Sequence, residues 1–216
     1  MRNKNKAFTL LEALVATATI GALIAIIIPA VGKAKETARR AICASNLRQT
    51  GIATTSYALD RNGYMPSNAS YIGLIHYRDA FGEFKPVDKG NLFTLDYTSE
   101  LGIFFCPSAD NFTPENEEIG IKNWGNGFVQ SSYLYKNKPR KTNMLVNSNT
   151  ATINDFEPNE SLGVDYNISP QKNQNHNLEF FNRLNLDTSV NGFNDNEGIL
   201  PSDLPYKTIF HLVENK

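Results

Sequence analysis

One carboxylate in an apolar stretch, Glu12, is the residue whose surroundings most strongly imply a chemical role. The other side chains between residues 8 and 28 are Phe, Leu, Ala, Val, Ile and Thr, with one Gly. A charge at the centre of a membrane costs roughly 2.5–3.5 kcal/mol, so such a residue is a functional candidate. If the chain were cut before Phe8, one helical turn earlier, the new ammonium could pair with this carboxylate or with that of a neighbouring molecule. The alternative is an ordinary membrane anchor whose glutamate lies near the interface.

The chain has two cysteines, Cys43 and Cys106, and no Cys-x-x-Cys or zinc-binding spacing. If the region after the apolar stretch is extracytoplasmic, its compartment permits a disulfide. Such a bond would close a loop of about 60 residues, worth about 4 kcal/mol in the chain-entropy model. It would tie a helix to a sheet. The alternative is two separate thiols in the core.

Patterns typical of catalysis are absent from the sequence. It contains no His-Glu-x-x-His, Gly-x-Ser-x-Gly or Gly-x-x-x-x-Gly-Lys motif. The three histidines are scattered: His76, His176 and His211. Asn194, Asp195 and Glu197 place oxygen ligands close together, as calcium requires, but loops of this composition are more often plain turns. We therefore predict no enzymatic activity and no cofactor, with calcium at this loop as the open alternative.

The apolar stretch itself fits a membrane span. Residues 8–28 are 21 in number. As a helix they extend about 31 Å, which matches the roughly 30 Å hydrocarbon core of a bilayer. The stretch is too long for the apolar region of a secretory signal peptide, which has about 7–15 residues. The basic leader, with Arg2, Lys4 and Lys6, is expected to stay in the cytoplasm.

The helix is expected to continue past the membrane, from about residue 9 to residue 59. At 100° per residue, one broad face carries Val31, Ala34, Ala38, Ile42, Ala53 and Tyr57. Residues 60–66 contain Asn-Gly and a Pro, which are helix stop signals. The sequence predicts one long helix, loosened near Gly21 and Pro29, whose second half packs on a head domain. Two helices hinged at Pro29 are the alternative.

From residue 67 onward the pattern changes to short apolar or alternating runs separated by Asn, Gly, Pro and Ser. These runs are residues 71–75, 103–105, 132–135, 161–166, 181–186 and 208–213. They predict a small, mostly antiparallel sheet with long loops. A long helix laid on one face of such a sheet is an α+β architecture.

Residues 6–15, Lys-Ala-Phe-Thr-Leu-Leu-Glu-Ala-Leu-Val, resemble the class III signal of type IV prepilins and type II secretion pseudopilins. In that family a membrane peptidase cuts between a small residue, usually Gly, and Phe, and then N-methylates the Phe. The resemblance implies cleavage between Ala7 and Phe8, methylation of Phe8 and an assembly role for Glu12. Gly21 and Pro29 fall where the family has a helix-loosening Gly and a helix-breaking Pro. Ala7 departs from the usual Gly and is also small.

The resemblance also implies a domain order and a location. Residues 1–7 would be the leader peptide, 8–29 the transmembrane and assembly helix, 30–60 its exported half, and 61–216 a periplasmic pilin-like head. The protein would lie in a bacterial inner membrane with its N-terminus cytoplasmic, and then in a periplasmic or surface fibre. Its partners would be the prepilin peptidase, other pilin or pseudopilin subunits, the inner-membrane assembly platform and, before assembly, membrane lipid.

The head is similar to one pseudopilin subgroup. Segments 42–49, 60–66, 104–108 and 131–133 occur in a similar order. That subgroup ends in a signature of His, nine residues and Asp-Gly. The nearest match here is His176 followed, one residue later than in the signature, by Asp187 and Thr188 in place of Gly.

Charge and length complete the expectations. The net charge of −1 becomes about −4 without the leader, because 18 basic residues then face 22 acidic ones. This acidic charge balance does not predict nucleic-acid binding. The expected function is a structural subunit, a minor pseudopilin or pilin-like protein, because the head is longer than a minimal major pseudopilin needs. The alternatives are a membrane-anchored periplasmic binding protein that does not polymerise and, less favoured, an anchored hydrolase.

Overall fold

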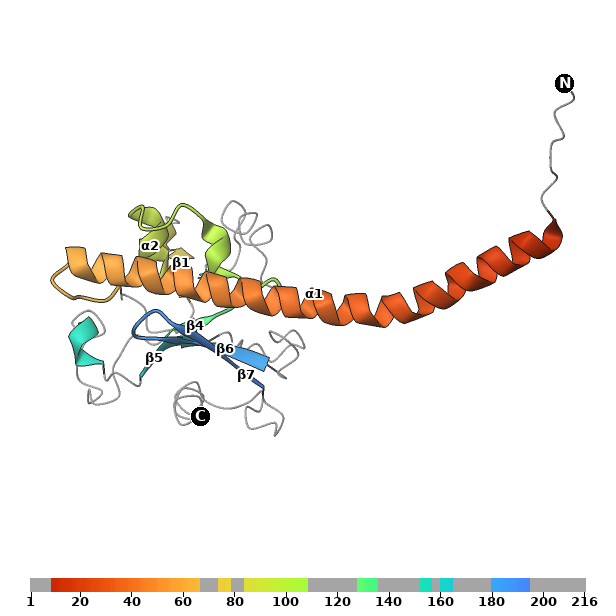
Figure 1. Cartoon of the computed structure of the whole chain (residues 1–216). Coiled ribbons are helices and arrows are strands. Elements are labelled where there is room, and N and C mark those ends of the chain that lie inside the picture. The colour runs from red at the N-terminus through yellow and green to blue at the C-terminus, as the bar shows by residue number, and fades with distance from the viewer. Residues whose placement is uncertain are drawn as a thin grey trace, which may run out of the picture. The chain divides into compact units, whose positions relative to one another are not determined.

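The computed structural model describes residues 9–66, 74–78, 84–108, 128–135, 152–156, 160–164 and 180–194 (Figure 1). The chain divides into two compact units, Met1–Ala38 and Arg39–Lys216. The predicted cleavage residues Ala7 and Phe8 lie outside the described residues, as do Asp195 and Glu197 of the calcium candidate. The predicted run at residues 208–213 lies outside them as well.

The long helix is present as α1, Leu10–Asp60, within one residue of its predicted bounds. It continues through Gly21 and Pro29. In its apolar part, the hydroxyls of Thr17 and Thr19 donate to the carbonyls of Ala13 (3.1 Å) and Ala16 (2.9 Å) of the same helix. Backbone and hydroxyl groups of this part are thus satisfied within the helix, which a lipid environment requires.

The stop signal after residue 60 acts as predicted. Asn62 and Gly63 adopt left-handed conformations, with φ of 54° and 86°. The Gly63 amide donates to the carbonyl of Ala58 at 2.7 Å, which closes the helix end in the manner of a Schellman motif. The Gly63 carbonyl then accepts from the amide of Ile153 at 2.7 Å, so the end of α1 is tied to a segment 90 residues later.

The buried face of α1 matches the predicted one in part, because Ala53 is buried and Tyr57 packs against the core. The buried residues are Cys43, Leu47, Thr50, Gly51, Ala53, Thr54 and Ala58. Ile42 and Val31, assigned to the packed face from the apolar pattern, are 49% and 56% exposed. The pattern misled because two of the buried positions are threonines, whose hydroxyls bond to the helix itself. The first buried residue of α1 is Cys43, well after residue 30, where the exported half was predicted to start.

In its described residues the second unit contains two antiparallel sheets, where one was predicted. One sheet has the order β2-β1-β3 and the other β4-β5-β6-β7. The strands are β1 Leu74–Arg78, β2 Phe84–Pro86, β3 Phe128–Gln130, β4 Leu134–Tyr135, β5 Ser161–Val164, β6 Phe180–Asn185 and β7 Val190–Asn194. A long helix with small antiparallel sheets is the α+β class that the sequence predicted.

Three short helices complete the described fold: α2 Gly90–Thr94, η1 Leu101–Phe104 and η3 Ile153–Asp155. The prediction of a sheet run at residues 103–105 is wrong, because Leu101–Phe104 forms a 3-10 turn. An apolar run of three residues cannot distinguish a buried strand from a buried turn. Its side chains lie in the core all the same, with Ile103, Phe104 and Phe105 each at most 3% exposed.

Alternate residues of β6 face α1 in the second unit. The guanidinium of Arg40 lies 4.6 Å from the ring centre of Phe180, and the Asn182 side chain donates to the Arg40 carbonyl at 3.3 Å. Leu184 lies against Gly51. The period of two along a strand puts these three side chains on one face. On the other face of β6, Phe181 stacks on Phe193 of β7, with ring centres 5.4 Å apart.

Candidate functional site

The first turn of α1 holds the carboxylate singled out by the sequence. The Thr9 amide and hydroxyl both donate to Glu12 Oε2, at 2.9 and 2.8 Å. In return the Glu12 amide donates to the Thr9 hydroxyl at 3.3 Å. This reciprocal pattern is a capping box, in which two otherwise unsatisfied amides at a helix start find partners.

The capping role of Glu12 was not predicted, although its signal was visible as Thr9-x-x-Glu12 before an apolar run. Glu12 therefore has a structural reason to exist in an isolated chain. The capped carboxylate is exposed, and a carboxylate has further lone pairs to offer a cation. Capping and pairing with an ammonium are compatible at this position.

The apolar part of α1 presents its large side chains outward. From Leu10 to Val31 these side chains are between 48% and 83% exposed. Among the described residues, α1 is the one helix long and apolar enough to cross a membrane, and none of its apolar window is buried. An exposed apolar surface of this size marks a membrane or protein contact rather than a water-facing helix.

Within the second unit, Cys43 of α1 and Cys106 form a disulfide, with their Cα atoms 5.3 Å apart. That distance is in the usual range of about 4.4–6.8 Å. The bond links residues 63 positions apart, and the two cysteines are 0% and 1% exposed. The α1 helix is thus covalently joined to the segment that follows η1.

Hydrogen bonds hold the segment that carries Cys106. The Ser131 hydroxyl donates to the Phe104 carbonyl at 2.7 Å, and the Ser132 hydroxyl accepts from the Cys106 amide. The Phe105 carbonyl accepts from two side chains, the Asn46 amide at 3.1 Å and the Tyr133 hydroxyl at 3.2 Å. Because all these groups are buried or half-buried, each bond satisfies a polar group that would otherwise be costly to bury.

This arrangement, which we name the cysteine clamp, consists of Cys43, Asn46, residues 104–106 and residues 131–133. It brings together three of the four segments on which the subgroup resemblance was based. The sequence predicted the two cysteines as candidates for a bond, with separate thiols as the alternative. It did not predict the serine and tyrosine contacts, because 25 or more residues separate them from their partners.

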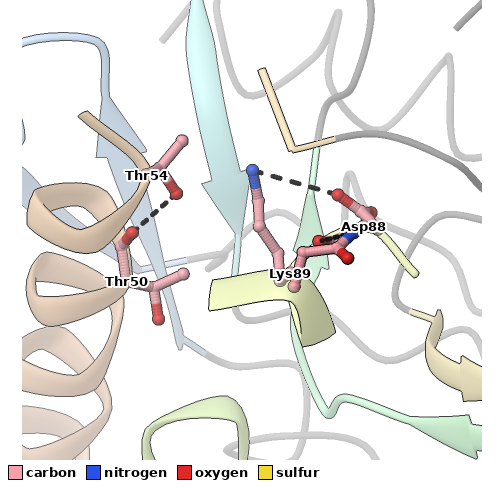
Figure 2. A network of polar contacts seen from close by, with 5 residues as sticks. Thr50, Thr54, Asp88 and Lys89 are labelled. Atoms are coloured by element: carbon pink, nitrogen blue, oxygen red, sulfur yellow. Dashed lines mark hydrogen bonds and ion pairs between the residues drawn. The ribbon is translucent and has the colours of Figure 1, made fainter. Parts of the chain in front are cut away.

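A second buried polar group lies beside α2. Asp88 and Lys89 are 0% and 1% exposed, and Lys89 Nζ lies 4.0 Å from Asp88 Oδ1 (Figure 2). Among the described residues Nζ makes no hydrogen bond, but it lies 5.5 Å from the ring centre of Tyr135. Asp88 also has a left-handed φ of 47°, which is strained for a residue other than Gly. Sequence patterns did not reveal this pair, because adjacent charges usually face water.

Burial shifts the ionisation of this group. It lowers the pKa of Lys89 below the ordinary value of 10.5, and the Asp88 carboxylate offsets the shift in part. Burial also raises the pKa of the Tyr135 phenol. A charged amine taken out of water carries a desolvation cost that one carboxylate at 4.0 Å only partly returns. The pair therefore acts as a stability determinant sensitive to pH.

The described residues contain no group of three or more His, Cys, Asp or Glu side chains that could hold a metal. Asn194 ends β7, and the rest of the calcium candidate lies outside the described residues. No protein-family model, curated protein or solved structure matches the chain.

Proposed function

We propose that this chain is a structural subunit of a pilus-like fibre, a minor pseudopilin or type IV pilin-like protein processed by a prepilin peptidase at Ala7 and Phe8. The observation that carries the proposal is the exposed apolar part of α1 with one carboxylate, Glu12, in its first turn. A helix of this kind has two environments that suit it, a lipid bilayer and a bundle of like helices. A carboxylate that meets an ammonium in either environment favours one register.

The disulfide supports an extracytoplasmic head. Structural disulfides persist in oxidising compartments such as the periplasm and are rare in the cytosol. Cys43 lies 15 residues after Ile28, the last residue of the predicted span. The head and the exported end of α1 would therefore lie on the oxidising side, with the leader on the cytoplasmic side.

In the proposed mechanism the leader orients the chain, the peptidase cuts before Phe8, and the helix then moves from lipid into a helical bundle. Glu12 meets the ammonium of a neighbouring Phe8 in that bundle. The capping box supports an addition to this scheme, since Thr9 holds the Glu12 carboxylate at the helix start before any partner arrives.

Charge and capping are separable by mutation. Glu12→Gln removes the charge but keeps an oxygen that can accept from Thr9, whereas Thr9→Ala removes the cap and keeps the charge. If Glu12 drives assembly, Glu12→Gln should be exported and membrane-bound but lost from sheared or purified fibres, and Thr9→Ala should still be incorporated. Glu36→Gln, one carboxylate further along α1, is the matched control.

The opposite result would identify Glu12 as a cap alone. In that case Thr9→Ala would be lost from fibres and Glu12→Gln would be incorporated like the wild type. A tethered periplasmic binding protein that does not polymerise would be absent from fibres in every variant and in the wild type. Mass spectrometry of the mature N-terminus tests processing separately. A terminus at Met1, or one beyond residue 28, would remove the basis of the proposal.

A further inference from the structure

We infer that the docking of α1 on the head depends on oxidation of Cys43 and Cys106, and that burial then makes the bond resistant to external reductants. The inference rests on the proposed function, which places the head in an oxidising compartment where the bond can form. It is carried by three observations: the composition of the docked face, the position of the bond on it, and the burial of both cysteines.

The docked face of α1 has little apolar surface of its own. Among its seven fully buried residues, Leu47 is the one bulky aliphatic side chain. The hydroxyls of Thr50 and Thr54 donate to carbonyls of their own helix, those of Asn46 (3.0 Å) and Thr50 (2.7 Å). Each of these hydroxyls thus has a partner within its own helix. Because hydrophobic stabilisation scales with the apolar area removed from water, this face docks weakly without further help.

The disulfide lies at the start of the docked face. Cys43 is the first buried residue of α1, and one turn later Asn46 donates to the Phe105 carbonyl, next to Cys106. The serines of the cysteine clamp hold the same backbone. A covalent link at this end keeps the rest of the face at high effective concentration against its partners. Without the link, the Asn46 contact loses the constraint that positions it.

The bond forms by thiol–disulfide exchange with a disulfide-bearing oxidant. One thiolate attacks the oxidant, a mixed disulfide forms, and the second thiolate displaces the oxidant as a dithiol. The two cysteines lose two protons and two electrons, and the oxidant gains them. Because Cys43 and Cys106 are 0% and 1% exposed in the docked state, the oxidant must act before docking is complete. Afterwards the same burial excludes an attacking thiolate, so oxidation is effectively one-way.

Hydrogen exchange tests the docking. The full chain in detergent micelles is compared as oxidised wild type, as Cys43→Ser/Cys106→Ser, and as Leu162→Ala. This control weakens the shared core from β5 and keeps both cysteines. We expect amides of residues 44–58 to exchange at least tenfold faster in the double serine variant, with β5 and β6 changing less than twofold. A uniform rise, no rise, or the same pattern in Leu162→Ala would overturn the inference.

Reductant access tests the one-way step. The oxidised wild type is incubated with dithiothreitol with and without urea, and free thiols are counted by alkylation and mass spectrometry. We expect labelling of Cys43 and Cys106 to require urea. Rapid labelling without urea would refute the protected bond. Neither measurement depends on fibre formation, so failure here and failure of the Glu12→Gln test are distinguishable.

Discussion

Gly51 of α1 and Leu184 of β6 lie in direct contact within the second unit. A Cβ added to Gly51 would stand 2.8 Å from Leu184 Cδ1 and 3.5 Å from Thr188 Cβ. Leu184 is 1% exposed and belongs to the core cluster, so its side chain has little room to withdraw. A glycine, unfavourable in a helix interior, thus lies where the β6–β7 hairpin comes close to α1.

Gly51→Ala should therefore destabilise the head despite its better helix propensity. Overpacking costs about 1–3 kcal/mol, and the helix gains about 1 kcal/mol, so we expect a net loss of up to ~2 kcal/mol. Chemical denaturation monitored by circular dichroism measures it. Gly32→Ala is the control, because no atom lies within 4 Å of a Cβ there. Adding Leu184→Val, which removes the Cδ1 atom, should recover part of the loss, and simple additivity of the two changes would contradict the steric account.

Replacing Thr188 with glycine should stabilise the head. Its φ of 64° is left-handed, which a β-branched residue adopts only under strain. This is also the position at which the subgroup signature has Gly. Relief of strain worth about 1–3 kcal/mol, offset in part by the greater backbone entropy of glycine in the unfolded chain, should raise the free energy of unfolding by about 1 kcal/mol in Thr188→Gly. Thr188→Ala keeps a Cβ and should gain less. An equal gain in both would show that the β-branch, rather than φ, causes the strain.

The Asp88–Lys89 pair should make head stability depend on alkaline pH. The folded pKa of Lys89 lies below the ordinary 10.5, so the unfolded chain binds more protons between the two values. The free energy of unfolding should then rise with pH toward 10.5. Measurements should stop near pH 9.5. Above about pH 10 the phenol of Tyr135 ionises in the unfolded chain first, because burial raises its pKa in the folded head, and the free energy of unfolding then falls. Chemical denaturation of the wild type and of a variant that lacks the Lys89 amine, at several pH values, measures this rise in the free energy of unfolding.

The matched variants for this pair are Lys89→Met and Asp88→Asn/Lys89→Met. Both should lose the alkaline rise. Lys89→Met alone leaves a carboxylate buried and should be less stable than wild type by about 3 kcal/mol, whereas the double variant should equal or exceed the wild type. A pH slope that persists in Lys89→Met would mean that another group titrates.

Membrane orientation should depend on the leader, because basic residues flank the apolar stretch on both sides. Arg2, Lys4 and Lys6 precede it, and Lys33, Lys35 and further arginines follow it. Under the positive-inside rule the basic residues that follow the stretch compete with the leader, so the cytoplasmic position of the leader depends on its own three charges. Neutralising the three leader residues with Gln should invert a fraction of the molecules.

Inverted heads would stay in a reducing compartment, so the readout is the redox state of Cys43 and Cys106 in cells. Alkylation with a mass-shifting reagent should detect free thiols in the leader variant and not in Lys33→Gln/Lys35→Gln, which favours the proposed orientation. Complete oxidation in both variants would show that another feature sets the orientation.

Sequence patterns predicted the elements that depend on local chemistry. The bounds of α1 follow from apolar composition and from the Asn62-Gly63 stop, and the α+β class follows from the change of pattern at residue 67. The capping of α1 by Thr9 and Glu12 was equally local, and its signature was readable although the prediction missed it. All these interactions join residues within a few positions of one another, so a short window contains their physical cause.

Tertiary structure alone decided which face of α1 is buried, how the cysteine clamp closes and why Asp88 and Lys89 are buried. The predicted face followed apolar side chains, but the buried one follows small side chains such as Thr50 and Thr54, whose polarity is masked by their own helix. Ser131 and Ser132 bond to residues 26 or 27 positions away. Such contacts depend on which segments meet after packing, and the apolar periodicity of a single segment carries no information on its partner.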